Sequence, residues 1–300
     1  MAYNLPSCVT SQENTGSKQC YEDFGWWRKL ILTPNDGEID TQTNAELLAT
    51  WTTAINAATG DRWYPLKNFF DKEDEDEETQ YKEGGAGQML ETREGKRSFT
   101  GMVKIALCEH QAYRTHNNRS NIKCYIVTSK GFILGTSSDG TKFEPFSINL
   151  FKAEKLTSAA NGSEVSMTPL KVILDDTTEW DDNGVYIKAS DCDFNPLTDL
   201  DGLQDVTLAV TSPTVAGFTL TVTTTCDQVP VTGLVKDDFV LVDDAGGAET
   251  ITTLTDNSDG TYTAAATLGA DDYILTMDDP EDATTKGYEA TSTATFTVSS

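Results

Sequence analysis

The last third of the chain constrains the fold most, because it reads as a series of short β-strands. Residues 204–300 contain 23 threonines and no tryptophan, and β-branched residues favour strands. Asp-Gly, Gly-Gly and Asp-Asp steps separate the expected strands, and such steps suit tight turns. The expected strands are Phe218–Thr225, Phe239–Asp243, Thr250–Asp256, Thr261–Leu268, Tyr273–Met277 and Ala294–Val298. This spacing over about 100 residues predicts a β-sandwich of two sheets.

Charge divides the chain near residue 200. The formal net charge is −26, of which residues 204–300 contribute −14 from 16 acids and two lysines. The shift predicts two domains, residues 1–203 and 204–300, that meet within Asn195–Val206. So negative a chain is not expected to read nucleic acid, which requires clustered cations, or to dock on an anionic membrane. We also expect no secretory signal, because Met1–Thr10 lacks a basic flank and an apolar run.

The first domain is expected to be mainly β with one flanking helix. The helix is predicted over Thr43–Gly60, where Leu47, Leu48, Trp51 and Ile55 recur at helical spacing and place Trp51 in the core. Trp26 and Trp27 are adjacent on an extended segment, so they point to opposite faces and one can meet a neighbouring subunit. The expected strands are Lys29–Pro34, Arg97–Glu109, Ile122–Thr136, Pro145–Leu156 and Val165–Asp176.

Several of these strands are long for a globular sheet, where about six residues is usual. The polar segment Glu109–Asn121 lies between two of them, which predicts a long hairpin arm that reaches beyond its own core. Exposed strand edges of this kind invite pairing with a neighbouring chain. The candidate contact residues of this arm are His110, Tyr113, Arg114, His116 and Arg119.

No motif predicts catalysis, a cofactor or a metal. His110 and His116 are the only histidines, and neither stands in a G-x-S-x-G, H-E-x-x-H or Cys-His context. Gly84–Gly87 lacks the Gly-Lys-Ser/Thr ending of a phosphate loop, and Asp256–Gly260 lacks the closing acid of a calcium loop. We therefore expect no catalytic residue, no cofactor site and no metal site, and a protein that is not an enzyme.

The six cysteines show no two-residue spacing of a zinc or redox motif. Reduced thiols are the default expectation for a chain without an export signal. Cys108 and Cys124 flank the expected hairpin, so they are the pair that could face each other across it.

The run Asp71–Glu78 holds seven acids and a single lysine. It can be a solvated loop, a metal-binding site, or a negatively charged surface that repels a polyanion. Repulsion is effective within a Debye length of about 8–10 Å, which is the scale of a narrow conduit filled by DNA. The candidate DNA-repelling residues are Glu73, Asp74, Glu75, Asp76, Glu77 and Glu78.

Three segments carry a resemblance to a known family. They read NFFDKEDEDEETQYKEGGAGQMLETREGKRSFTGMVKIAL, YIVTSKGFILGTSSDGTKFEPFSINLF and LDDTTEWDDNGVYIK. The stretch from about Trp63 to Lys188 resembles the tail-tube (major tail) proteins of long-tailed bacteriophages, and the C-terminal segment resembles bacterial immunoglobulin-like domains. The resemblance implies a β-sandwich or half-barrel with one flanking helix and an appended immunoglobulin-like sandwich.

The same resemblance implies a structural virion protein. Its copies would close into homohexameric rings that stack through the hairpin arm, with DNA passing through the lumen without specific binding. Other virion tail proteins would be partners, and the chain would be made in the host cytoplasm and reside in the tail. The alternative is a surface adhesin or decoration protein that binds carbohydrate through the C-terminal domain. A capsid decoration or neck protein would share much of this composition.

Overall fold

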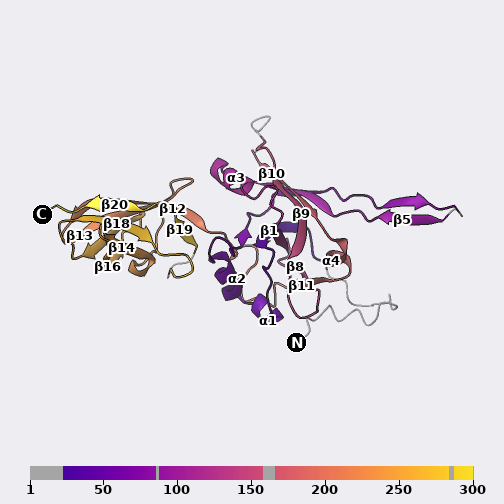
Figure 1. Cartoon of the computed structure of the whole chain (residues 1–300), viewed down its shortest axis with the longest axis horizontal. Helices are drawn as coiled ribbons and strands as arrows, with labels where there is room; N and C mark the ends of the chain where they lie inside the picture. The colour runs from indigo at the N-terminus through magenta and orange to yellow at the C-terminus, as the bar shows by residue number, and fades with distance from the viewer. Residues whose placement is uncertain (1–22, 86–87, 158–165, 284–286, 300) are drawn as a thin grey trace. The chain divides into compact units, whose positions relative to one another are not determined.

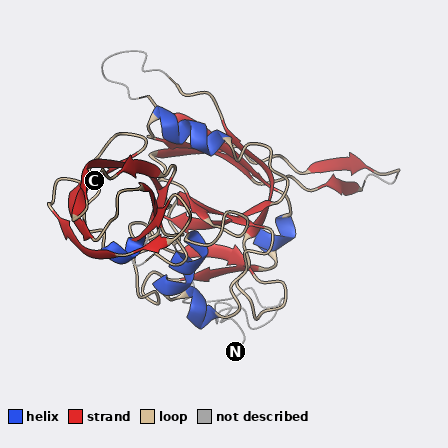
Figure 2. Ribbon diagram, turned by 60° about the vertical axis from the view of Figure 1, so that its left-hand side comes forward, coloured by secondary structure: helices blue, strands red, loops and turns tan. Residues whose placement is uncertain are grey.

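The computed structural model describes residues 23–85, 88–157, 166–283 and 287–299. The chain divides into two compact units, the first ending at Asp201 and the second beginning at Gly202, with Asn56–Ala58 grouped with the second. This division falls two residues from the expected one. The fold is mainly β, as predicted, and strands dominate both units in Figure 2.

The first unit is built on one curled sheet of the order β11-β8-β7-β9-β10-β6-β3, with β1 paired to both β7 and β2. The strand β9 joins the two halves, because its first residues pair with β7 and the rest pair with β10. The strands are β1 (Trp27–Pro34), β2 (Tyr64–Pro65), β3 (Asp71–Asp74), β6 (Ser98–Val103), β7 (Ile122–Thr128), β8 (Ile133–Thr136), β9 (Phe146–Ala153), β10 (Thr168–Leu174) and β11 (Gly184–Ile187).

Two hydrophobic cores lie on opposite faces of β1 and β7. Leu30 and Leu32 enter one core with Phe99 and Phe151, whereas Ile31 between them enters the other. This alternation follows from the period of two in a strand. Burial on both faces explains why these two strands read as nearly continuous apolar runs.

The expected helix over Thr43–Gly60 forms as two shorter helices, α1 (Gln42–Ala45) and α2 (Leu48–Ile55). The break falls at the α1 C-cap Glu46 and at Leu47, which is 40% exposed instead of joining the apolar stripe. Trp51 is fully buried, as its helical spacing predicted, and its Nε1 donates to Ala45 O at 2.9 Å.

The expectation of a hairpin loop over Glu109–Asn121 was wrong. The helix α3 (Leu107–Arg114) begins there, because the Glu109 carboxylate accepts a hydrogen bond from the Ala106 backbone N at 2.9 Å and caps the first turn. A further short helix, α4 (Thr177–Asp181), carries Trp180, and Asp176 caps its first turn. The first unit therefore has more helices than the one expected.

A long hairpin arm does exist, but it is built from the acidic run. The strands β4 (Gln80–Glu83) and β5 (Met89–Arg93) extend the β3–β6 pair and project from the rest of the first unit in Figures 1 and 2. Backbone hydrogen bonds continue between the two pairs, with Glu75 N to Ser98 O at 2.8 Å and Glu77 N to Lys96 O at 2.9 Å. At the tip, Gly84 N donates to Gln88 O at 2.7 Å, which begins the expected glycine turn. Residues 86 and 87 lie outside the described part.

The second unit is the predicted sandwich. One sheet has the order β16-β17-β13-β12-β19 and the other β15-β14-β18-β20. The strands are β12 (Gln204–Thr214), β13 (Gly217–Thr224), β14 (Phe239–Asp243), β15 (Ala248–Glu249), β16 (Ile251–Asp256), β17 (Thr261–Ala266), β18 (Asp272–Met277), β19 (Tyr288–Ala290) and β20 (Ala294–Thr297), and a short 3₁₀ turn (Lys236–Asp238) precedes β14. Tyr262 is buried between the sheets, and its hydroxyl donates to Val231 O at 2.8 Å. Sequence patterns did not predict β12 or β19.

The cysteines depart from the expectation of reduced thiols. Cys108 and Cys226 each take part in a disulfide bond, whereas Cys124 and Cys192 are free. The pair Cys108–Cys124 therefore does not form, since Cys124 is a fully buried free thiol in the core beneath β7. Burial raises the pKa of the Cys192 thiol to about 12, so this thiol is not activated. Cys8 and Cys20 lie outside the described residues.

Candidate interaction site

The tip of the hairpin arm exposes apolar side chains. Every residue of β4 and β5 is exposed, and Tyr81, Met89 and Leu90 are 56%, 65% and 56% exposed. A lone two-stranded hairpin is marginally stable in water, and clustered exposed apolar groups mark interaction surfaces. The tip is therefore the first candidate for contact with another chain.

The register of β4 and β5 sorts the tip side chains onto two faces. Tyr81 lies opposite Glu91, and Glu83 lies opposite Met89. Directly opposed residues share a face of the hairpin, and residues two apart on a strand do so as well. Tyr81, Glu83, Met89 and Glu91 thus form one acidic and apolar face, which we call the tip face. Lys82 and its opposite residue Leu90 lie on the other side.

The first half of the acidic run is the paired strand β3, and backbone bonds from Glu75 and Glu77 continue its ladder. None of the three interpretations of the sequence included such pairing. Residues two apart share a face, so Glu73, Glu75 and Glu77 lie on one side and Asp74, Asp76 and Glu78 on the other. Lys72 Nζ lies 4.3 Å from the centroid of the Trp27 ring, which places the even-numbered residues near the strand root on the core side. The six carboxylates therefore do not line up on a single face. Negative charge is present on both faces.

Four of the six candidate acids have partners within the chain, and the first of them, Asp74, is paired with Lys72. Glu75 is paired with Lys171 at 2.6 Å and accepts from Thr100 Oγ1 at 3.0 Å, and the lysine contact, followed by the threonine, lowers the pKa of its carboxyl. Asp76 accepts from Ser98 N at 2.9 Å, and Glu77 is paired with Arg93 at 2.6 Å. These contacts bind the run to its neighbours. The described residues contain no cluster of His, Cys, Asp and Glu that could hold a metal ion.

The five residues expected to form an inter-ring arm lie in α3 and the turn that follows it. His110 and His116 are buried, at 5% and 8% exposure. His110 Nδ1 lies 3.0 Å from Thr168 Oγ1, and the Tyr113 hydroxyl accepts from Lys67 N at 2.9 Å. Arg119 Nε donates to Thr115 O at 3.0 Å. Arg114 lies in the last turn of α3. The five predicted arm residues are thus His110, Tyr113, Arg114, His116 and Arg119. Their assignment to a projecting arm was wrong, because the segment packs against the sheet.

The burial of His116 predicts that the free energy of unfolding depends on pH. Burial, aided by the charge of Arg119, lowers its pKa to about 4, and its ring packs 4.6 Å from that of Tyr64. The unfolded chain takes up this proton near pH 6.5 and the folded chain only near pH 4, so stability falls as pH drops through that interval, by up to about 3 kcal/mol. Urea unfolding at pH 7 and pH 4.5 should show a smaller difference for His116→Gln than for the unaltered chain. An equal difference would show that His116 is not the group responsible.

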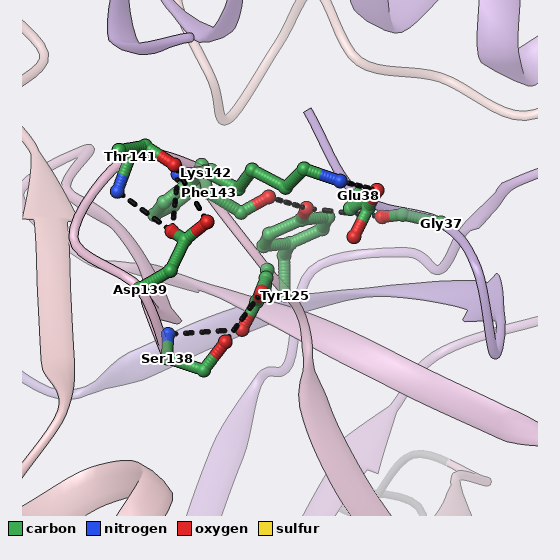
Figure 3. A network of polar contacts seen from close by, with 9 residues as sticks. Gly37, Glu38, Tyr125, Ser138, Asp139, Thr141, Lys142 and Phe143 are labelled. Atoms are coloured by element: carbon green, nitrogen blue, oxygen red, sulfur yellow. Dashed lines mark hydrogen bonds and ion pairs between the residues drawn. The ribbon is translucent and has the colours of Figure 1, made fainter. Parts of the chain in front are cut away.

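A polar network fixes the loop between β8 and β9 (Figure 3). This loop contains the sequence SSDGTK, which belongs to the second of the three segments that resemble tail-tube proteins. Asp139 accepts from Thr141 N at 2.7 Å, from Thr141 Oγ1 at 2.6 Å and from Lys142 N at 3.1 Å, contacts that lower its pKa to about 2. Lys142 pairs with Glu38, and the Tyr125 hydroxyl lies 3.0 Å from Gly37 O and 2.7 Å from Phe143 O. These bonds fix the loop to the core.

The curled sheet of the first unit has open ends. Its order terminates at β11 on one side and at β3 on the other. In the described part of the chain, the outer backbone edge of β3 is not paired with any strand. An unpaired edge is a template for a strand from another chain.

Comparison of the chain with protein-family models and with curated protein sequences finds no match. In the described residues no helix is both long and apolar enough to cross a membrane.

Proposed function

We propose that this protein is a structural subunit that assembles with copies of itself into a hollow tube, the tail tube of a long-tailed bacteriophage. The observation that carries the proposal is the hairpin arm, which projects from the first unit and exposes Tyr81, Met89 and Leu90 at its tip. Apolar groups exposed to water at the tip do not stabilise a monomer, and such exposed patches mark interaction sites. A second chain that packs on the tip would bury these side chains.

The open sheet supports closed rings. Exposed edges lead to uncontrolled association unless they are covered, and a closed ring covers every one of them. The strand β3 combines an open edge with charged residues, which guard against pairing with unrelated strands. Homohexameric rings follow from the resemblance to tail-tube proteins.

Charge supports a conduit for DNA. The net charge of −26 is spread over both units, and the acids of the run Glu73–Glu78 occur on both faces of their strand. Whichever face of this strand lines the lumen therefore presents carboxylates, which repel phosphates at the short distances inside a narrow tube. DNA would pass without specific binding.

The second unit has a separate core, so it would decorate the tube. We expect negative-stain micrographs of the purified chain to show hollow tubes or stacked rings, and a chain ending at Leu203 to form the same rings. If only the full chain assembles, the second unit belongs to the assembly contact. If neither chain forms rings or tubes, the proposed function is wrong.

A surface adhesin remains the second candidate, and one observation favours it. Thr211, Thr219, Thr263 and Thr255 stand directly opposite one another across β12, β13, β17 and β16. Their side chains face away from the core, because Phe218 and Leu220 beside Thr219 point into it. This uncharged hydroxyl row suits a neutral polysaccharide. Glycan binding by residues 204–300, in a full chain that stays monomeric, would favour the adhesin.

A further inference from the structure

A cationic cavity lies at the root of the hairpin arm. It has a volume of about 310 Å³, and Phe70, just before β3, and Lys104, just after β6, are among its lining residues. Arg28 from β1 and Lys67 also line it, while the fully buried Lys29 contacts Leu200 O behind them. We call the surface formed by Arg28, Lys67, Phe70 and Lys104 the root pocket.

The charge of the root pocket is unusual in this chain, which has 22 lysines and arginines against 48 acids. Lys67 is paired with Glu109, and Lys29 lies 3.6 Å from Asp201, the one acid among the described residues that line the cavity. Within the described residues neither Arg28 nor Lys104 has a carboxylate partner, and the guanidinium of Arg28 lies 4.9 Å from the Trp26 ring. Unpaired cations beside a cavity favour an anionic occupant.

The root pocket also exposes an apolar side chain, which favours an occupant with an apolar group. Phe70 is 72% exposed, the most exposed large hydrophobic side chain described, and it lines the cavity together with Lys67 and Lys104. Its occupant should therefore combine carboxylates with apolar or aromatic groups. The tip face has this composition, with Glu83 and Glu91 beside Tyr81 and Met89.

We propose that the tip face of one copy docks in the root pocket of a second copy. Glu83 and Glu91 meet Arg28 and Lys104, and Tyr81 and Met89 cover Phe70. This inference rests on the proposed self-assembly and adds the pair of surfaces that makes the contact.

The geometry excludes docking of the arm in its own pocket. The first strand of the arm runs from Asp71 at the start of β3 to Glu83 at the end of β4, which spans roughly 40 Å at 3.3 Å per residue. The continuous backbone ladder prevents the arm from folding back on its root. The contact is thus between different copies and joins two different surfaces, so it repeats head to tail. It builds an open stack where the repeat does not close into a ring.

Photo-crosslinking tests the contact directly. A benzophenone amino acid replaces Tyr81 in one preparation, which is mixed with an unaltered chain that carries a different tag. We expect crosslinks from position 81 to the peptides around Phe70 and Lys104 of the tagged chain. The same probe at Leu90 is the matched control, because Leu90 is equally exposed, at 56%, but lies on the opposite face.

Crosslinks to the root pocket without tubes in micrographs would support the docking and overturn the proposed function. Tubes without such crosslinks, or equal crosslinks from positions 81 and 90, would overturn the docking. The absence of both tubes and crosslinks would overturn both.

Charge reversal supplies a second readout. Arg28→Glu with Lys104→Glu should raise the concentration needed for assembly about tenfold, and Glu83→Lys with Glu91→Lys should do the same. All four changes in one chain should restore assembly, because the ion pairs reform with opposite polarity. The matched control, Lys152→Glu with Lys155→Glu, changes the net charge equally and should assemble normally. Failure of the fourfold variant to recover, with its fold intact by circular dichroism, would contradict the pairing.

Discussion

Replacing the arm tip Gln80–Arg93 with an Asn-Gly turn is expected to abolish assembly and leave the first unit folded. The tip strands β4 and β5 bury none of their residues, so removing them takes nothing from either core. The turn joins Thr79 to Glu94, just beyond the Glu77–Lys96 backbone bond, and Asn-Gly is the dipeptide that two-residue hairpins favour. Negative-stain images should show no tubes, and the circular dichroism spectrum should keep its strand signal.

The control for this deletion is a chain that keeps the arm but carries Lys82→Ser, on the side opposite the tip face. It should assemble as the unaltered chain does. Tubes of normal length from the deleted chain would show that the arm is not the assembly element. Loss of the fold in the deleted chain would show that the tip supports the first unit, contrary to its exposure.

Trp51→Ala is expected to lower the free energy of unfolding of the first unit by about 3–5 kcal/mol. Trp51 is fully buried, and its ring lies 5.4 Å from that of Trp63 and 5.2 Å from that of Tyr125. The substitution leaves a large cavity between α2 and the sheet and takes away the donor to Ala45 O. Such a loss is a large part of the stability of a domain, so assembly should fail because the fold fails.

The contrast with Trp26 makes this prediction specific. Trp26 is 37% exposed and contacts Arg28 through its ring, whereas its neighbour Trp27 is buried against Phe99 and Trp180. Trp26→Ala should therefore cost less than about 1 kcal/mol in urea unfolding. Equal losses for the two variants would mean that Trp51 is not a core anchor.

The second unit was the more predictable part of the fold, and the reason is physical. In β13 the buried apolar residues alternate with threonines, and in β17 buried and less buried residues alternate in the same way. This period of two identifies a strand by itself. The strand β12 was missed because Ser212-Pro213 and the acid Asp205 interrupt its pattern. The three-residue strand β19 pairs with β12 in parallel, a long-range contact that local sequence does not encode.

The prediction of an arm over Glu109–Asn121 was wrong, and the arm that the structure shows lies in a segment for which none was predicted. Polar composition over Glu109–Asn121 suggested a projecting loop, yet the capping of Ala106 by Glu109 starts a helix that packs His110 against Thr168. The acidic run was read as an unpaired segment because Asp and Glu rarely occur in strands. It becomes a strand because β6 offers a ladder from Asp71 to Asp74, a pairing that depends on the tertiary fold.

The root pocket could not be predicted from the sequence. Arg28, Lys67 and Lys104 are far apart in the chain, and each is an ordinary surface cation by itself. They meet because β1, the segment after β2 and the end of β6 converge at the root of the arm. The one local signal was the run of two aromatic residues at Phe69-Phe70, of which Phe69 is buried and Phe70 is exposed.

Sedimentation velocity of the purified full chain over a range of concentrations tests self-assembly most directly. We expect the 32.7 kDa chain to give way to large, fast-sedimenting polymers as concentration rises, and the deletion of Gln80–Arg93 to remove them. A single monomer boundary at every concentration would contradict this expectation.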